Sequence, residues 1–113
     1  MIDAYAFGRL ETGGKTYDAD VILFPDRVEP NWWRREGHRL TIADLGTVLA
    51  YCPEVFVVGT GASGMMTVPP ETRAAFEARG IRVIVEPTPE AVETFNRLLG
   101  EGTRVAAGLH LTC

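Results

Sequence analysis

Residues Val55–Gly64, which read VFVVGTGASG, decide the fold class of this 113-residue chain. The first four are apolar without alternation, as is typical of a central strand that helices cover on both faces. Gly59, Gly61 and Gly64 follow in the G-x-G-x-x-G spacing, and Glu86 lies near the end of the next predicted strand. In dinucleotide-binding proteins such glycines let the backbone approach a pyrophosphate, and the carboxylate binds a ribose hydroxyl. The stretch therefore predicts an α/β domain with a glycine-rich loop after a buried strand.

The residues after the glycines argue against a dinucleotide. In a dinucleotide site the helix begins inside the glycine loop, so that its amide N–H groups meet the pyrophosphate. Here residues 65–70 come before any helix can start, and 113 residues cannot supply two mononucleotide-binding halves. We therefore expect no NAD, FAD or other cofactor. A purely structural loop and a small-ligand or anion site remain as alternatives. The residues of that site would be Gly59, Thr60, Gly61, Ser63, Gly64, Thr88 and His110.

The chain from residue 41 onward alternates between helices and strands. Thr41 and Asp44 resemble a capping box before an apolar helical face that ends at Cys52, which we expect to be a small buried hydrophobe. Thr88 is the predicted cap of a later helix, with Pro89 at the first helical position. The predicted elements are helices over residues 41–52, 70–79 and 88–99, and strands over residues 54–59, 81–85 and 104–111.

The last predicted strand has two unequal faces. Its odd-numbered positions from 105 to 111 are apolar, whereas the other face has little bulk beside His110. Gly108 lies on that second face, where a glycine often marks the close approach of backbone or ligand.

The first third of the chain predicts antiparallel β structure. A Gly13–Gly14 pair suits a tight hairpin turn. Asp18 and Asp20 form a period-two pair before a strand, and we interpret them as solvated charges at a sheet edge. The predicted strands cover residues 5–11, 15–17 and 21–24, and residues 27–40 are expected to form a short strand or extended segment followed by a loop. The whole pattern predicts a three-layer α/β fold with a central mixed sheet, covering helices and an N-terminal antiparallel β layer.

Composition and charge narrow the function classes. Residues 1–113 are expected to form a single domain, since this is close to the commonest domain size. Eleven basic and fifteen acidic residues give a net charge of −4, spread over both halves, so no nucleic-acid partner is expected. No apolar run approaches the roughly 20 residues of a membrane span. Two cysteines and no visible signal peptide predict a cytoplasmic location. Self-association through the β-rich first third remains open.

No complete catalytic or metal-binding set is visible. Ser63 follows Gly61 as in a nucleophile elbow, but no helix starts directly after it. His110 and Cys113 are too few ligands for a metal, and His38 is far away in sequence. We therefore predict no catalytic residue and no metal site.

The segment Trp32–Arg35, which reads WWRR, is the second unusual feature. Neighbouring side chains of an extended segment point to opposite sides, so at most one indole readily enters the core. The other indole, beside an arginine, has the composition of a protein-interaction hot spot. Packing of both rings beneath the loop is the alternative. The candidate partner-binding residues are Trp32, Trp33, Arg34 and His38.

Several of these motifs occur together, and in the same order, in one known family. They are Trp33–Arg34, Gly37–His38, Asp44–Leu45, Pro53–Val55, Val58–Gly61, Gly80–Ile81, Thr88–Val92, Phe95–Asn96 and Glu101–Gly102. In these residues the chain resembles the Mth-type domain family, which includes an adipogenesis-associated protein and a mitochondrial respiratory complex I assembly factor. The resemblance covers nearly the whole chain. It implies a three-layer fold with a central mixed sheet, and it supplies no catalytic residue to carry over.

Two functional hypotheses follow. The preferred one is a non-catalytic protein-interaction or assembly module that uses the Trp32–His38 region. The alternative is a small-ligand or anion binder, with or without enzymatic activity, built on the Gly59–Gly64 loop.

Overall fold

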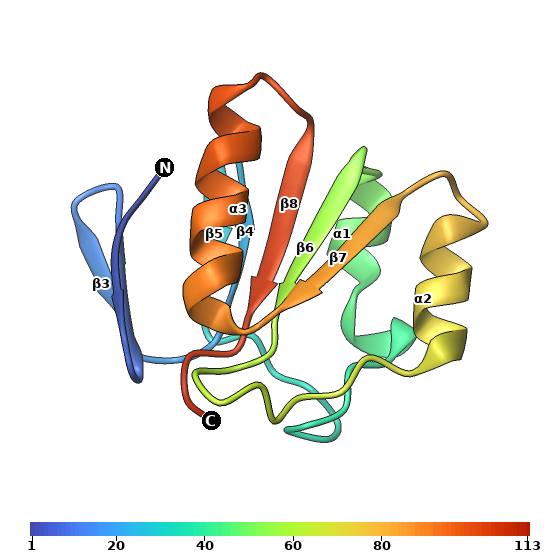
Figure 1. The fold of residues 1–113 in the computed structure, drawn as a ribbon, viewed down its shortest axis with the longest axis horizontal. Helices are drawn as coiled ribbons and strands as arrows, with labels where there is room; N and C mark the ends of the chain where they lie inside the picture. Colours follow the sequence, from blue (N-terminus) through green and yellow to red (C-terminus); the bar gives the residue numbers. More distant parts are fainter.

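A computed structural model describes residues 1–113, which form two β-sheets and three α-helices (Figure 1). The first sheet is antiparallel, in the order β1-β2-β3. The second is mixed, in the order β5-β4-β8-β6-β7, with β8, β6 and β7 parallel and β4 and β5 antiparallel. The strands are β1 (Ile2–Ala6), β2 (Arg9–Thr12), β3 (Lys15–Tyr17), β4 (Val21–Phe24), β5 (Arg27–Glu29), β6 (Val55–Gly59), β7 (Arg82–Glu86) and β8 (Val105–Leu109). The predicted mixed sheet and separate N-terminal β layer are confirmed.

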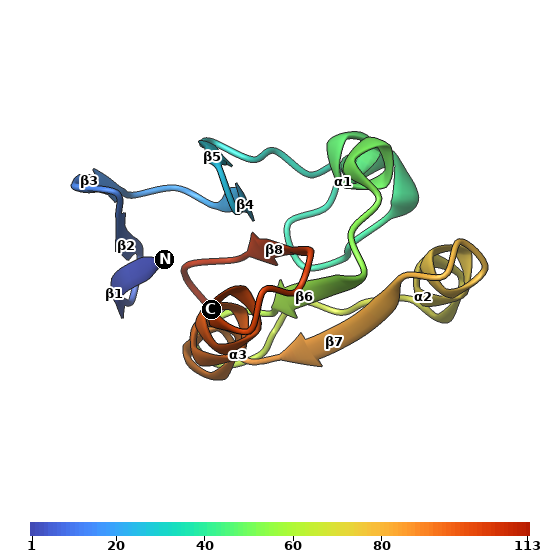
Figure 2. The ribbon, with the colours of Figure 1, turned by 90° about the horizontal axis from the view of Figure 1, so that it is seen from above.

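Helices cover both faces of the mixed sheet (Figure 2). They are α1 (Gly46–Tyr51), α2 (Pro70–Glu77) and α3 (Thr88–Gly100), and a short 3-10 helix, η1 (Ile42–Asp44), precedes α1. Residues of α3 and the N-terminal sheet pack on one face, whereas residues of α1 and α2 pack on the other. Asn96 of α3 ties the N-terminal sheet to this body, because its amide both accepts from Ile2 N and donates to Ile2 O at 2.8 Å. None of the helices combines the length and apolar character that crossing a membrane requires.

The alternation of side chains along β6 explains why the fold has two cores. Val55 and Val57 belong to the core beneath α3, and Phe56 and Val58 to the core beneath α1 and α2. All five residues of β6 are buried, as the unbroken apolar run predicts. The two faces of β8 alternate in the same way, so the sequence prediction for both strands is confirmed.

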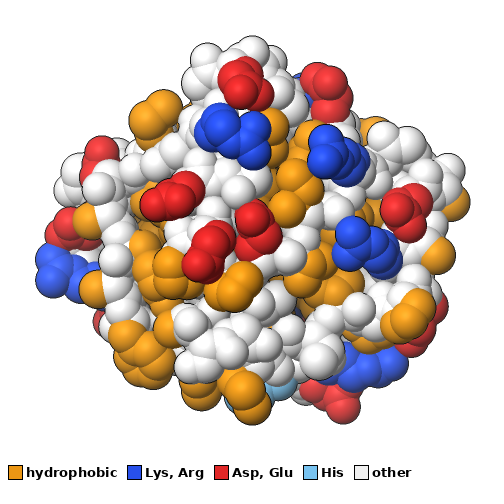
Figure 3. All heavy atoms as spheres, in the orientation of Figure 1, with side chains coloured by type: hydrophobic (Ala, Val, Ile, Leu, Met, Phe, Trp, Pro, Cys, Tyr) orange, Lys and Arg blue, Asp and Glu red, His pale blue; other side chains and the backbone are white.

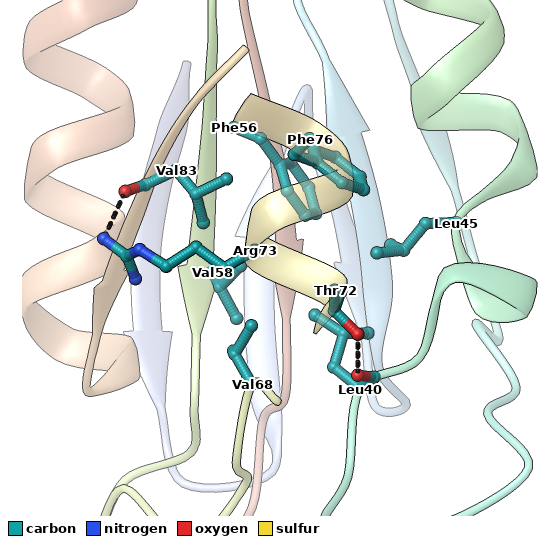
Figure 4. A pocket seen from close by; sticks show the side chains of 9 residues that line it. All are labelled: Leu40, Leu45, Phe56, Val58, Val68, Thr72, Arg73, Phe76 and Val83. Atoms are coloured by element: carbon teal, nitrogen blue, oxygen red, sulfur yellow. Dashed lines mark hydrogen bonds between the residues drawn. The ribbon is translucent and has the colours of Figure 1, made fainter. Parts of the chain in front are cut away.

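An apolar crevice lies between α2 and the mixed sheet (Figure 4). The space between its atoms is about 160 Å³ including its mouth, yet no water molecule fits inside. The Phe56 and Phe76 rings stack there with centroids 5.2 Å apart. Thr72 Oγ1 donates to Leu40 O, and Arg73 Nη2 donates to Val83 O, both at 3.0 Å. The crevice is therefore a packed part of the core.

The predicted strand over residues 5–11 is wrong in one respect. A turn at Phe7 and Gly8 divides it into β1 and β2. Gly8 adopts a φ of 73°, a conformation that glycine enters without a Cβ clash. The Gly13–Gly14 turn between β2 and β3 is confirmed, with positive φ at both residues.

The predicted helix over residues 41–52 is also divided. Leu45, with φ −124° and ψ 23°, separates η1 from α1. The capping interaction is present, since Asp44 Oδ2 accepts from Thr41 N at 3.1 Å and from Thr41 Oγ1 at 2.9 Å. The expectation for Cys52 is wrong: it is exposed and left-handed at the end of α1, with φ 52°. The helix stops one residue too early to turn this side chain into the core.

Candidate functional site

Four segments meet at the carboxyl ends of β6 and β8, at the bottom of Figure 1. They are the 31–39 segment, the Gly59–Gly64 loop, the start of α3 and the tail that follows β8. The structure therefore brings the two sequence-predicted sites to one end of the molecule. Asp20, which immediately precedes β4, joins them there.

A buried charged cluster of Asp20, Arg34 and His110 lies at the centre of this region. Arg34 Nη2 and His110 Nδ1 each lie 2.8 Å from Asp20 Oδ2. The other carboxylate oxygen accepts from Leu111 N at 2.8 Å. Arg34 is held from a second side by Gly37 O, which accepts from its Nη2 at 2.7 Å and its Nε at 3.3 Å. The arginine is thus fixed in one geometry.

Burial makes this cluster energetically important. The side chains of Arg34 and His110 are 4% and 8% exposed, and that of Asp20 is 17% exposed. Burial alone would raise the pKa of Asp20, but the hydrogen bonds from Leu111 N, His110 and Arg34, together with the charge of Arg34, outweigh it and lower this pKa below 3.8. Asp20 is therefore ionised at neutral pH and compensates the guanidinium charge.

Burial and the nearby Asp20 charge raise the pKa of Tyr5 above 10.0.

The interpretation of Asp20 as a solvated edge charge is wrong. Asp18 is exposed, as expected, but Asp20 turns inward beneath the 31–39 segment. The sequence carries one signal for the burial of Asp20: this acidic residue directly precedes β4, in which every residue is apolar. Its partners are 14 and 90 residues away in sequence, so local spacing does not reveal them.

Two buried polar atoms of the cluster have no hydrogen-bond partner: Arg34 Nη1 and His110 Nε2. His110 Nδ1 lies 2.8 Å from Asp20 Oδ2 and 3.2 Å from Arg34 Nη2. We assign the Nδ1 proton to the bond with Asp20, because that contact is shorter and the carboxylate can only accept. Nε2 is then the ring nitrogen that has no partner. The exposed His38 ring lies edge-on to His110, with centroids 5.3 Å apart.

The Gly59–Gly64 loop is filled by the chain's own tail. Ala62 N donates to Thr112 O at 2.6 Å, and Met65 N donates to Cys113 O at 3.0 Å. A Cβ on Gly61 would lie 2.5 Å from Cys113 O and 2.9 Å from His110 Cδ2, so only glycine fits against the tail. In a phosphate-binding loop, such amides point at the ligand. Here both amides bind backbone carbonyl oxygens instead.

Thr88 connects this loop to β8 instead of capping α3. Its Oγ1 accepts from Gly61 N at 2.8 Å and donates to His110 O at 2.6 Å. Pro87, not Thr88, is the N-cap residue of α3, so the predicted cap is wrong by one position. The Thr88 hydroxyl, on a fully buried residue, thus forms hydrogen bonds to the segments that follow β6 and β8.

The remaining predicted ligand residues are placed differently. Gly59 packs against Leu109 and Thr88, and Thr60 Oγ1 donates to Glu86 O at 3.1 Å. Ser63 and Gly64 are exposed at the tip of the loop. Gly59, Thr60, Gly61, Thr88 and His110 are therefore brought together. None of the four cavities in the structure is lined by the loop or by His110.

The two tryptophans diverge as the extended segment predicts. Trp32 is half-buried: its Nε1 donates to Asp44 O at 3.0 Å, and its ring covers Gly108, where a Cβ would lie 2.9 Å from Cη2. The close approach predicted at Gly108 is thus made by an indole. Trp33 is 75% exposed, and the Arg34 guanidinium lies 4.8 Å from the Trp32 ring centroid.

Two other exposed apolar residues border the same end of the sheet. Phe7 is 65% exposed beside Gly8, whose N donates to Leu111 O at 2.8 Å. Met65 is 55% exposed, and its own N–H binds the tail. We call Phe7, Trp33 and Met65 the apolar rim. In Figure 3, apolar side chains gather along the left part of the lower edge, whereas charged side chains of both signs lie along its right part and over α3.

Residues 2–110 match the family described as a protein of unknown function (DUF498/DUF598). The chain belongs to this family. It is similar to the conserved hypothetical protein PH1505 of Pyrococcus horikoshii OT3, with 31% identity over 100% of this chain and 99% of that one, and a TM-score of 0.84. A Bartonella henselae protein described as an outer membrane protein is 30% identical over 99% and 94% of the two chains, with a TM-score of 0.85.

A Bordetella pertussis protein described as a Mth938-like domain shares the fold. It is 24% identical over 97% of this chain and 84% of that one, with a TM-score of 0.72. The predicted resemblance to Mth-type domains is confirmed at the level of the fold, and the family that the chain belongs to is DUF498/DUF598. Roles in adipogenesis or complex I assembly do not follow from it.

Proposed function

We propose that this family member is a non-catalytic protein-interaction or assembly module that binds its partner through the apolar rim. The observation that carries the proposal is that three separate chain segments at this end of the mixed sheet each expose one large apolar side chain. Gly8, next to Phe7, and Met65 bind the tail through their N–H groups, and Trp33 directly precedes Arg34 of the buried cluster. Exposed apolar residues scattered singly need no explanation, but a group of them indicates a contact surface. Aromatic side chains contribute most to such contacts.

The buried cluster supports this surface from below. Arg34 follows Trp33 directly and is fixed by Asp20 and Gly37, while Trp32 is fixed on the other side by Asp44. Trp33 is thus anchored at both neighbours and loses little backbone freedom on binding. Of the residues predicted from the sequence, Trp33 and His38 are exposed and available to a partner, whereas Trp32 and Arg34 position them.

We place this role in the cytoplasm and assign it to residues 1–113 as one domain. An assembly role would parallel that of the complex I assembly factor of the Mth-type family, by analogy of family and not of a shared site. A second copy of the chain is one form of partner, which sedimentation over a concentration series would reveal.

The test is a comparison of two single variants. Trp33→Ala removes the most exposed rim side chain, and Val85→Ala removes an apolar side chain that is 36% exposed on β7, outside the rim. Partners captured by the tagged wild-type protein are identified, purified and titrated against each variant. Trp33→Ala should weaken binding by about 2 kcal/mol or more, roughly 30-fold, while Val85→Ala should not. Equal affinities for all three proteins would contradict the proposal.

The second candidate is a small-ligand or anion binder at the Gly59–Gly64 loop. The supporting observation is that the loop amides of Ala62 and Met65 already bind two acceptor oxygens, those of the tail. A ligand would replace those oxygens. Thermal unfolding with phosphates, nucleotides and carboxylates tests this candidate, since a ligand stabilises the folded state by RT ln(1 + [L]/Kd). Unchanged melting temperatures across that panel would exclude it.

A further inference from the structure

The largest cavity of the structure lies between the N-terminal sheet and the mixed sheet. It measures about 310 Å³ and opens to solvent, whereas the crevice beneath α2 admits no water. The hairpin of β2 and β3, the hairpin of β4 and β5, and Phe95 of α3 line it. We call this cavity the hairpin cleft. Its size is at the lower end of the range for small-molecule sites, about 300–1,000 Å³.

The floor of the hairpin cleft is apolar. Leu23 and Phe95 line the cleft, are each 2% exposed and belong to the core beneath α3. Val28, which is opposite Leu23 in the pairing of β4 with β5, is half-buried against the same core, as is Tyr17. A hydrocarbon group in the cleft would remove these surfaces from water, which favours its binding.

One charge of the hairpin cleft lacks a countercharge. Lys15, the only lysine of the chain, lines the cleft and takes part in none of the ion pairs of the structure. The two other charged residues of the lining, Asp26 and Arg27, pair with each other at 3.4 Å. The Arg27 guanidinium also lies 4.0 Å from the centroid of the Phe24 ring. The lining therefore carries a single uncompensated positive charge, which is complementary to a monovalent anion.

The strand register turns Lys15 toward the apolar floor. Alternate residues of a strand project from the same face, so Lys15 and Tyr17 of β3 share one face. Their partners in β2 are Thr12 and Leu10, and Leu10 is fully buried in the core beneath α3. This face of the N-terminal sheet is thus the one that packs on the body, and Lys15 lies at its solvent-accessible end.

We propose that the hairpin cleft binds a small amphipathic carboxylate, with the anionic group at Lys15 and the hydrocarbon body on Leu23, Val28 and Phe95. At roughly 30 Å³ for each water-sized group, the volume of about 310 Å³ holds about ten non-hydrogen atoms, as in a saturated carboxylate of about eight carbons. The cleft is lined by none of the apolar rim and by none of the Gly59–Gly64 loop, so it stands independently of the partner-binding role and of the loop site.

Octanoate, octanol and acetate separate the contributions of charge and hydrocarbon. Octanol keeps the body without the charge, and acetate keeps the charge without the body. The ¹⁵N-labelled full chain is titrated with each compound at constant pH and ionic strength. We expect octanoate to displace the amide signals of Gly13, Lys15 and Val28 saturably, with an apparent Kd on the order of 1 mM. The Trp33 indole signal should stay in place, and octanol and acetate should each bind at least about fivefold more weakly.

Three variants assign the roles within the cleft. Lys15→Glu reverses the charge and should weaken octanoate binding at least about tenfold while it leaves octanol binding unchanged. Lys15→Arg keeps the charge and should keep the affinity for octanoate. Val28→Thr places a hydroxyl on the floor and should weaken both compounds alike.

Arg9→Gln is the matched control. It removes an exposed cation from the other face of the same sheet, where Arg9 pairs with Glu11 outside the cleft, and it should change neither affinity.

Several results would overturn the proposal. Equal octanoate affinities of wild type, Lys15→Glu and Arg9→Gln would show that Lys15 is no anchor. Displacement of the Trp33 indole signal alone would place octanoate on the apolar rim, and signals that drift linearly without saturation would leave solvent as the only occupant of the cleft. If Lys15→Glu does not fold, the wild-type chain decides, because equal affinities for octanoate and octanol refute a role of the charge.

Discussion

Replacing Asp20 by asparagine should destabilise the protein more than any other single change of charge. Asp20 Oδ2 accepts from Arg34 and His110, and its Oδ1 accepts from Leu111 N. In Asp20→Asn, if the amide oxygen keeps the bond to Leu111, the NH₂ group faces two other donors. The variant thus removes a countercharge and introduces a donor–donor contact in the same place.

The size of the expected loss of stability follows from the burial of Asp20 and Arg34. Breaking a buried ion pair by removing one partner destabilises a protein by about 3–5 kcal/mol, because the remaining charge is left uncompensated. The side chain of Asp20 is 17% exposed, so some water reaches it, and we expect about 3 kcal/mol. That is a large part of a total stability on the order of 5–15 kcal/mol. With a urea m-value of about 1–3 kcal/mol/M, the unfolding midpoint should fall by roughly 1–3 M.

Equilibrium urea unfolding of wild type, Asp20→Asn and Asp18→Asn measures this loss. Asp18 is exposed and makes no ion pair, so its variant should stay within about 0.5 kcal/mol of wild type. Arg34→Met in the Asp20→Asn background removes the uncompensated charge and should recover part of the loss. A loss below about 1 kcal/mol for Asp20→Asn, with an unchanged m-value, would show that Asp20 does not compensate a buried guanidinium charge.

Three further outcomes are expected. Folding lowers the pKa of Asp20, so the stabilisation by this carboxylate is complete above its ordinary pKa of 3.8 and is lost as the pH falls below 3.8. The unfolding free energies of wild type and Asp20→Asn should therefore converge at low pH. A constant difference between them down to about pH 2 would contradict this expectation. Gly61→Ala places a Cβ 2.5 Å from Cys113 O at a φ of 108°, so it should destabilise by about 1–3 kcal/mol and speed hydrogen exchange at the tail-bound Met65 amide, which unaltered exchange would disprove. Gly108→Ala forces the Trp32 ring away from β8, with a loss of about 1–3 kcal/mol and a shifted Trp32 indole signal; a wild-type indole signal would show that the ring is not packed there.

The sequence predicted the layered architecture because its signals are local. The unbroken apolar run of β6 and the two-faced pattern of β8 each reflect which sides of a strand are covered, and the structure confirms both. The Gly13–Gly14 turn and the divergence of Trp32 from Trp33 likewise depend only on backbone geometry. The errors in element bounds and in the burial of Cys52 arose where the backbone conformation of a single residue interrupts a strand or helix, at Gly8, Leu45 and Cys52.

The arrangement of the candidate site could not be predicted from the sequence, because it depends on tertiary structure. Asp20, Arg34 and His110 come from three segments separated by up to 90 residues, and nothing in their local patterns marks them as partners. Long-range charge pairing is set by which segments the fold brings to one sheet end, and burial then decides that these charges must compensate each other. The same holds for the glycine loop: its amino acids suit a ligand, but the path of the tail decides that backbone carbonyls occupy it.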